Sequence, residues 1–175
     1  MDVMTATEMT TATWQVRAID PGVCEELRRR DDAGNPPRLM TDDEGGSPLR
    51  CCLRPIRPGE RVALVSYAPL RRWARASGAD PGPYDEVGPV FIHAGPCAGP
   101  AGAGYPAAVH GSRRVLRAYS ADGRILGGRL TEPDEVADPG SAAAVLAEVF
   151  ADPDVALVHV RAVDFGCFTF EIRKL

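Results

Sequence analysis

Hydrophobic and polar residues alternate in several short runs of the sequence, which is the pattern of β-strands with one buried face. In the first run, Trp14 and Val16 alternate with Gln15 and Arg17. Other alternating or wholly apolar runs predict further strands at residues 38–41, 49–55, 61–67, 88–94, 115–120, 124–130, 155–163 and 167–173. Glycine and proline separate most of these runs, so the sequence predicts a protein built mainly from short strands.

Two segments show the spacing of a helix instead. Asp138 and Pro139 open the clearer one, because aspartate caps a helix and proline fits its first turn. Its apolar residues then recur every three or four positions, at Ala142, Val145, Leu146, Val149 and Phe150. On the same grounds a shorter helix is expected from Asp20-Pro21 to about Arg30.

The last two predicted strands form a hairpin around Asp164-Phe165-Gly166, because a final glycine permits the left-handed backbone that three-residue loops favour. One face of this hairpin would pair Val158 with Ile172, Val160 with Phe170, and Ala162 with Phe168. The other face would pair His159 with Glu171, Arg161 with Thr169, and Val163 with Cys167. We therefore expect an α+β fold, with a mainly antiparallel β-sheet and one or two helices packed on one face.

Two stretches fall outside this pattern. Residues 1–12 are rich in threonine and methionine without a period, which predicts a disordered leader before a single domain at 13–175. Residues 95–111 consist largely of glycine, alanine and proline around Cys97, Tyr105 and His110. Such a composition predicts a mobile loop or lid rather than part of a core.

Composition excludes several classes of function. The chain of 175 residues has a net charge of −4, so it lacks the basic surface that nucleic acids and anionic membranes attract. It contains neither a long apolar run nor a signal peptide, and we expect a cytoplasmic protein. Its five cysteines are an odd number in a chain without an export signal, which predicts free thiols rather than a disulfide framework.

Several short motifs are distinctive. They are Pro-Tyr-Asp-Glu-Val-Gly-Pro-Val-Phe-Ile-His at 83–93, Leu-Arg-Ala-Tyr at 116–119 before Asp122-Gly123, Asp-Pro at 152–153 before His-Val at 159–160, and Gly-Cys at 166–167. Together with Arg-Cys-Cys-Leu at 50–53 and Pro-Gly-Glu at 58–60, they resemble the bacterial Domain of Unknown Function 1203 family from about Trp14 onward. The resemblance implies a small, soluble, single-domain bacterial protein and brings no activity or catalytic residue.

Strand alternation would gather polar and thiol side chains on one sheet face beneath the 95–111 loop, a common arrangement in binding sites. An enzyme built there would use His93, Cys97, His159 and Glu171. His93 would lower the pKa of the Cys97 thiol, whereas His159 would act as a general base oriented by Glu171. An ordinary cross-strand polar pair and a small loop residue explain the same pattern without catalysis.

A metal site is an alternative hypothesis. A mixed set of nitrogen and sulfur donors suits zinc or copper, and this chain offers Cys51 (or its neighbour Cys52), His93, Cys97, His159 and Cys167. The spacing of these residues matches no metal motif, so no motif implies a cofactor. Cys24, on the shorter helix, is interpreted as a small buried hydrophobic residue.

A non-catalytic ligand-binding or interaction module is the third hypothesis. Arg117 and Arg161 on neighbouring strands would clamp a carboxylate or phosphate, with Tyr119 and Tyr84 beside it. Our main expectation is a protein that binds a small anionic or carbonyl-containing molecule on the polar sheet face. It would serve as an accessory enzyme of secondary metabolism, using His/Cys acid–base or thiol chemistry.

Overall fold

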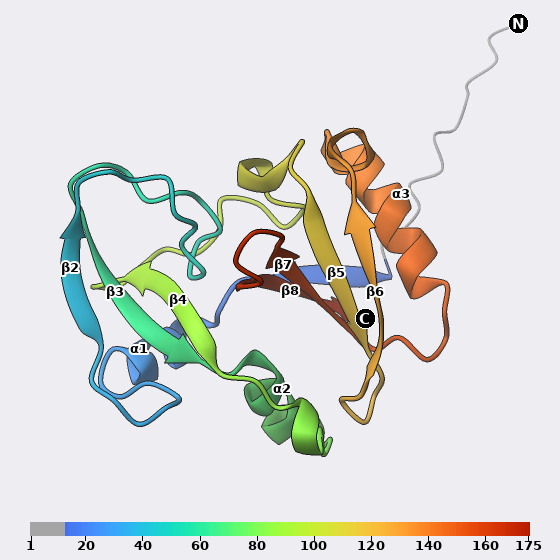
Figure 1. Cartoon of the computed structure of the whole chain (residues 1–175), viewed down its shortest axis with the longest axis horizontal. Helices are drawn as coiled ribbons and strands as arrows, with labels where there is room; N and C mark the ends of the chain where they lie inside the picture. Colours follow the sequence, from blue (N-terminus) through green and yellow to red (C-terminus); the bar gives the residue numbers. More distant parts are fainter. Residues whose placement is uncertain (1–12) are drawn as a thin grey trace, which may run out of the picture.

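The strands of this computed structural model, which describes residues 13–175, form two antiparallel sheets (Figure 1). The predicted leader at 1–12 lies outside the described residues. The larger sheet has the order β1-β8-β7-β5-β6, with bounds Trp14–Arg17, Phe168–Lys174, Leu157–Ala162, Arg114–Tyr119 and Ile125–Thr131. The smaller sheet has the order β2-β3-β4, with bounds Arg38–Asp42, Glu60–Tyr67 and Gly88–His93. The α+β class and the antiparallel pairing are confirmed, with two sheets where one was expected.

Three α-helices accompany the sheets in the described part of the chain: α1 at Pro21–Leu27, α2 at Pro69–Ser77 and α3 at Pro139–Phe150. The caps of α1 and α3 are the predicted ones, since Asp20 and Asp138 accept hydrogen bonds from the first free amides of these helices. Short 3-10 turns occur at Gly82–Tyr84, Ala107–Val109 and Pro133–Val136. None of the helices at residues 13–175 is long and apolar enough to cross a membrane.

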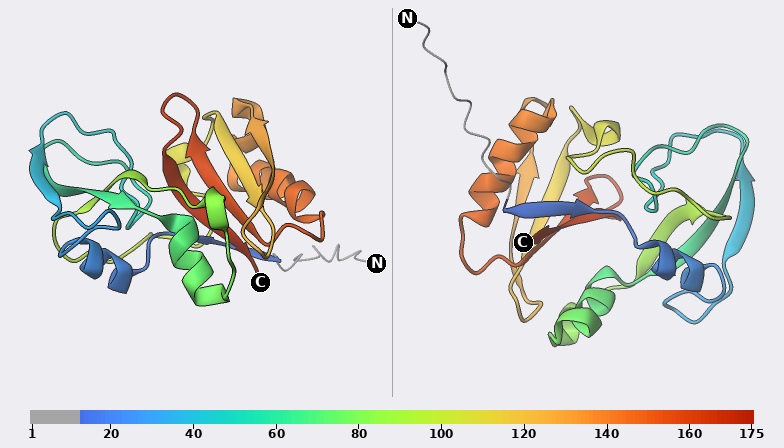
Figure 2. Two further views of the ribbon diagram at one scale, coloured as in Figure 1. Left: turned by 60° about the horizontal axis from the view of Figure 1, so that its bottom comes forward. Right: turned by 180° about the vertical axis from the view of Figure 1, so that it is seen from behind.

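The two faces of the five-stranded sheet have different partners. One face contributes Val158, Val160, Phe170 and Ile172 to a core with Leu146 and Phe150 of α3. The other face meets α2, where Leu70 and Trp73 pack against Tyr119 and Leu157. The two sheets lie side by side with α2 near their junction (Figures 1 and 2). The face predicted to be apolar is therefore the one that α3 covers.

The register of the closing hairpin is confirmed in its outer half and wrong near the loop. Val158, His159 and Val160 oppose Ile172, Glu171 and Phe170 as predicted. A bulge between Val160 and Arg161 then brings Arg161 opposite Phe168, so the three predicted pairs closest to the loop do not form. The bulge turns the Phe168 ring toward the other face, where it packs 5.4 Å from the ring of Tyr67 and 5.2 Å from that of His159.

The strand predicted at 49–55 is wrong, because this segment forms a tight turn. The amide of Leu53 donates to the carbonyl of Leu49, and Leu53 has a left-handed backbone with φ of 59°. Only isolated bridges remain of the strand, between Pro48 and Pro55 and between Leu49 and Phe91. The two consecutive cysteines at 51–52 therefore lie in a turn and not on a sheet.

Arg50 attaches this turn to both sheets. Its buried side chain donates from Nε to the carbonyl of Phe168 on β8 at 2.8 Å. Its backbone amide donates to the carbonyl of Phe91 on β4, and its own carbonyl accepts from Ile19, both at 2.9 Å. Burial lowers the pKa of Arg50 to about 10. The next residue, Cys51, is thus held at a defined place between the sheets.

The 95–111 loop contributes to the core, contrary to expectation. Tyr105 and Val109 are buried in the cluster that includes α3, and the ring of Tyr105 lies 5.5 Å from that of Phe170. A single aromatic side chain anchors this run of small residues, because its ring reaches the sheet where alanine and glycine cannot. Residues 105–109 consequently lie on the opposite face of the sheet from His159.

Candidate functional site

Four side chains with metal-ligating atoms meet between the two sheets: Cys51, Cys52, His93 and Cys97. Their ligand atoms all lie within 4.8 Å of one another. The 50–54 turn supplies two thiols, the end of β4 supplies the imidazole, and the loop that follows β4 supplies the third thiol. Both thiols of the turn are buried, whereas His93 and Cys97 are half-buried.

The imidazole and the thiols point at one another. His93 Nδ1 lies 3.3 Å from the sulfur of Cys51 and 3.9 Å from that of Cys52. The amide of His93 donates to the Cys51 sulfur at 3.3 Å, and the amide of Gly99 donates to the Cys97 sulfur at 3.4 Å. Such N–H groups favour the thiolate form that binds metals.

Burial opposes ionisation of the two thiols in the turn. It raises the pKa of Cys51 far above that of an ordinary thiol, and it raises the pKa of Cys52 in spite of a hydrogen bond from the Arg54 backbone. A thiolate here needs a positive partner, and a bound metal ion is the kind of partner that removes thiol protons outright.

The other nitrogen of His93 faces an ion pair. The Arg54 guanidinium lies 2.9 Å from Nε2 and also binds Glu60 at 2.6 Å, while Glu60 Oε1 lies 3.8 Å from the same nitrogen. Burial and the charge of Arg54 lower the pKa of His93, which keeps the imidazole neutral, the form that coordinates metals. Arginine can only donate, so Arg54 donates to Nε2 in this structure. A metal on Nδ1 would leave the proton on Nε2, and the Glu60 carboxylate, now 3.8 Å away, would have to replace Arg54 as its hydrogen-bond partner.

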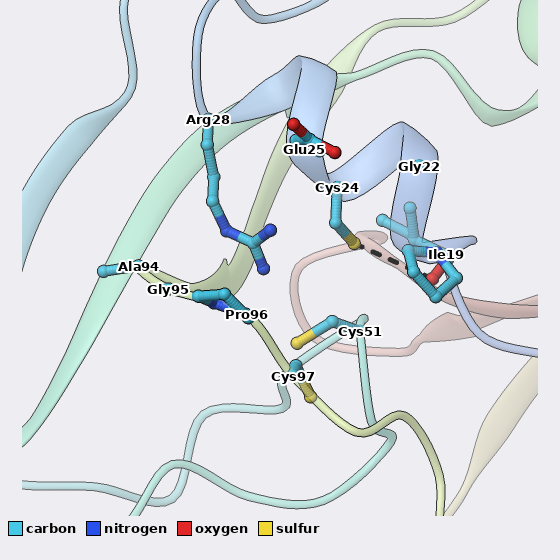
Figure 3. A pocket seen from close by; sticks show the side chains of 11 residues that line it. Ile19, Gly22, Cys24, Glu25, Arg28, Cys51, Ala94, Gly95, Pro96 and Cys97 are labelled. Carbon is cyan, nitrogen blue, oxygen red and sulfur yellow. Dashed lines mark hydrogen bonds between the residues drawn. The ribbon is translucent and has the colours of Figure 1, made fainter.

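A pocket of about 430 Å³ leads to the cluster from the side of α1 (Figure 3). The sulfurs of Cys51 and Cys97 line it together with Cys24, whose thiol is directed to the carbonyl of Ile19. Arg28, the residue after α1, extends toward the pocket and donates from Nε to the carbonyl of His93 at 2.9 Å, which fixes the end of β4. Burial raises the pKa of Cys24 to about 11, consistent with its interpretation as a small buried residue.

His159 and Cys167 do not join the cluster, because both belong to the five-stranded sheet and its hairpin. His159 is fully buried between the rings of Tyr119 and Phe168, and neither of its nitrogens has a hydrogen-bond partner in the described structure. Glu171 lies opposite as predicted, but its Oε2 is 4.0 Å from His159 Nε2, too far for a hydrogen bond. Burial lowers the pKa of His159 and raises that of Glu171.

The two arginines expected to clamp a ligand do converge, on a carboxylate of the protein itself. Arg117 Nη1 lies 3.0 and 2.9 Å from the two oxygens of Glu86, and Arg161 binds the same carboxylate. Tyr119 is buried, and the exposed Tyr84 lies at the end of the 3-10 turn Gly82–Tyr84. Glu86, just before β4, therefore occupies the position that the sequence interpretation gave to a ligand anion.

Cys52 is the one member of the cluster that sequence reasoning treated only as a substitute for its neighbour. A strand would have pointed Cys51 and Cys52 to opposite faces, and only the tight turn directs both sulfurs to His93. Two consecutive cysteines between Pro48 and Pro55 were the available signal, since the flanking prolines favour a turn.

Two antiparallel sheets, three short helices and a cluster of three thiols and one imidazole define a small α+β protein with a candidate centre for a thiophilic metal. Residues 46–174 match the family model described as "Protein of unknown function (DUF1203)", and the chain belongs to that family. The match begins later than the resemblance at Trp14 and includes all four residues of the cluster. Searches of the curated proteins and of the solved structures gave no match.

Proposed function

We propose that this protein binds one zinc ion or a similar thiophilic metal through Cys51, Cys52, His93 and Cys97. The observation that carries the proposal is the convergence of three sulfurs and one imidazole nitrogen within 4.8 Å. Three thiolates and one imidazole form a donor set that structural zinc sites use, and this set leaves no position open for substrate. The bound metal would tie the 50–54 turn to the end of β4 and the loop after it.

Metal content and spectroscopy test the proposal. Protein expressed with zinc and freed of loosely bound ions should contain about one metal per chain, and cobalt substitution should give the intense absorption of tetrahedral thiolate coordination. Cys97→Ser should lose most of the bound metal. Cys167→Ser removes a thiol that lies outside the cluster and should keep it. Wild-type protein without stoichiometric metal, or equal loss in both variants, would refute the proposal.

Thiol chemistry at Cys97 is the second candidate function. Its support is that Cys97 is the half-buried thiol of the cluster and lines the pocket beside Cys51. Alkylation of the protein with zinc bound and again after zinc removal separates the two candidates. A nucleophilic Cys97 would react much faster than Cys167 in both samples, whereas a Cys97 that serves as a metal ligand would react only after the zinc is removed. A role in secondary metabolism stays a prediction.

A further inference from the structure

We propose that a second pocket, beside β1 and β8, binds small molecules that carry a carboxylate, through Arg17 and Arg173. The pocket has a volume of about 440 Å³, within the range of sites for small molecules. The sequence predicts an anionic ligand at Arg117 and Arg161, whereas this pocket lies at the β1 edge of the same sheet. The pocket adjoins the candidate metal centre at Cys51, but the proposal does not depend on a metal and would stand if none bound.

Strand register places the polar groups of this pocket on one face. Arg17 lies opposite Glu171, and Gln15 lies opposite Arg173, in the antiparallel pair of β1 and β8. Cross-strand partners and residues two apart point to the same side of a sheet, so these four side chains share a face. All four line the pocket. The intervening Val16 also touches it, although most of its side chain is buried in the core that includes α3.

Three arginines line the pocket, and they differ in how far they are already engaged. Arg17 is exposed and makes no ion pair within residues 13–175, and Arg173 is held 2.5 Å from Glu171 with its Nε buried and unpartnered. Arg72 also lines the pocket but is already bound to Asp32 at 2.8 Å. Arg17 therefore offers an unengaged guanidinium beside one whose position Glu171 fixes.

A single carboxylate suits this pair better than a multiply charged anion. Its planar shape matches the parallel N–H groups of a guanidinium. The buried carboxyl of Glu171 lies on the same face, and its repulsion of an anion grows with the charge of that anion. Tyr67, Pro69 and Pro100 provide apolar walls, which would accept a short hydrocarbon body.

Nuclear magnetic resonance of the ¹⁵N-labelled protein tests this assignment. Wild-type protein would be titrated with acetate, butyrate and benzoate, and with inorganic phosphate at the same ionic strength. We expect saturable shifts for at least one carboxylate, confined to residues near 15–17, 98–100 and 171–173. Arg17→Gln should weaken that binding about tenfold or more, as expected for loss of a hydrogen bond between charged groups.

Arg38→Gln is the matched control, because Arg38 is another exposed strand arginine without an ion pair in the described part of the chain. It should bind the carboxylate as the wild type does. The proposal fails if no carboxylate gives saturable shifts at this pocket, if both variants lose affinity equally, or if phosphate binds as tightly as the best carboxylate.

Discussion

His93 on β4 and His159 on β7 differ in what surrounds their ring nitrogens. His93 has Cys51 at 3.3 Å from one nitrogen and Arg54 at 2.9 Å from the other. His159 is wholly buried, and neither of its nitrogens has a hydrogen-bond partner in the described structure. An imidazole can bind a metal where neighbouring thiols supply further metal ligands and polar groups orient its ring. An imidazole without such neighbours packs between aromatic rings as a buried side chain.

Substitution of each histidine should give the largest contrast. His93→Ala removes the only nitrogen donor of the proposed metal set, so zinc affinity should fall by more than the roughly 10–100-fold that loss of a residue supporting a ligand costs. His159→Leu should leave zinc affinity unchanged, because His159 lies outside the cluster. Competition with a chromophoric chelator measures both. Equal affinities for the two variants would remove His93 from the metal site.

The pH dependence of stability should separate the histidines a second time. Burial lowers the pKa of His159 in the folded protein, whereas an unfolded histidine takes up its proton near pH 6.5. Acidification below that pH therefore favours the unfolded chain, by up to about 1.4 kcal/mol per pH unit until the folded group also titrates. His159→Leu should flatten this loss between pH 6.5 and 5 in urea denaturation.

The neighbouring carboxyl of Glu171 gives the pH dependence of stability the opposite sign. Burial raises the pKa of Glu171, so its contribution is present at low pH and is lost as the pH rises through the folded value. Only the difference between wild type and His159→Leu thus reports on the imidazole. His110→Gln, which keeps the buried His159, should retain the slope that His159 contributes. A slope for His159→Leu as steep as that of the wild type would contradict this account.

The smallest effect is expected at the ion pairs of the five-stranded sheet. Glu86→Gln removes the carboxylate that Arg117 and Arg161 share, but the Glu86 side chain is 47% exposed, and exposed pairs contribute little. The free energy of unfolding should fall by about 1 kcal/mol or less, with metal binding unaffected. Chemical denaturation at low and high salt measures it, and a loss of several kcal/mol would show that Glu86 has a larger structural role.

Local pattern in the sequence was sufficient for most of the fold. A wholly apolar run located β3, and alternation located β4, β5 and the closing hairpin. The capped apolar repeat located α3, because all these elements are determined by neighbouring residues. The separation into two sheets was not predictable in this way. It depends on contacts such as that of Arg50 with the Phe168 carbonyl, which join residues far apart in the chain.

The candidate site shows the same limit more sharply. Cys51, His93 and Cys97 were proposed as metal ligands from residue type alone, and the structure brings these three together. His159 and Cys167 have the same residue types, but His159 lies on β7 of the five-stranded sheet and Cys167 in the loop between β7 and β8. Cys52 belongs to the cluster only because the turn at 50–54 directs its sulfur to His93. The cross-strand partner of Arg161 differs from the predicted one because of a bulge that no sequence pattern indicates.

Arg50 links the turn that carries two thiols of the cluster to β8 of the five-stranded sheet. A metal that held the 50–54 turn would also hold the guanidinium that binds the Phe168 carbonyl, and opening of β8 would then require release of the turn. Hydrogen exchange of backbone amides along β8, at the far side of this bond from the thiols, would slow in proportion to metal occupancy. Hydrogen exchange along β8, a strand without cysteine, would therefore measure whether the cysteines of the cluster hold a metal.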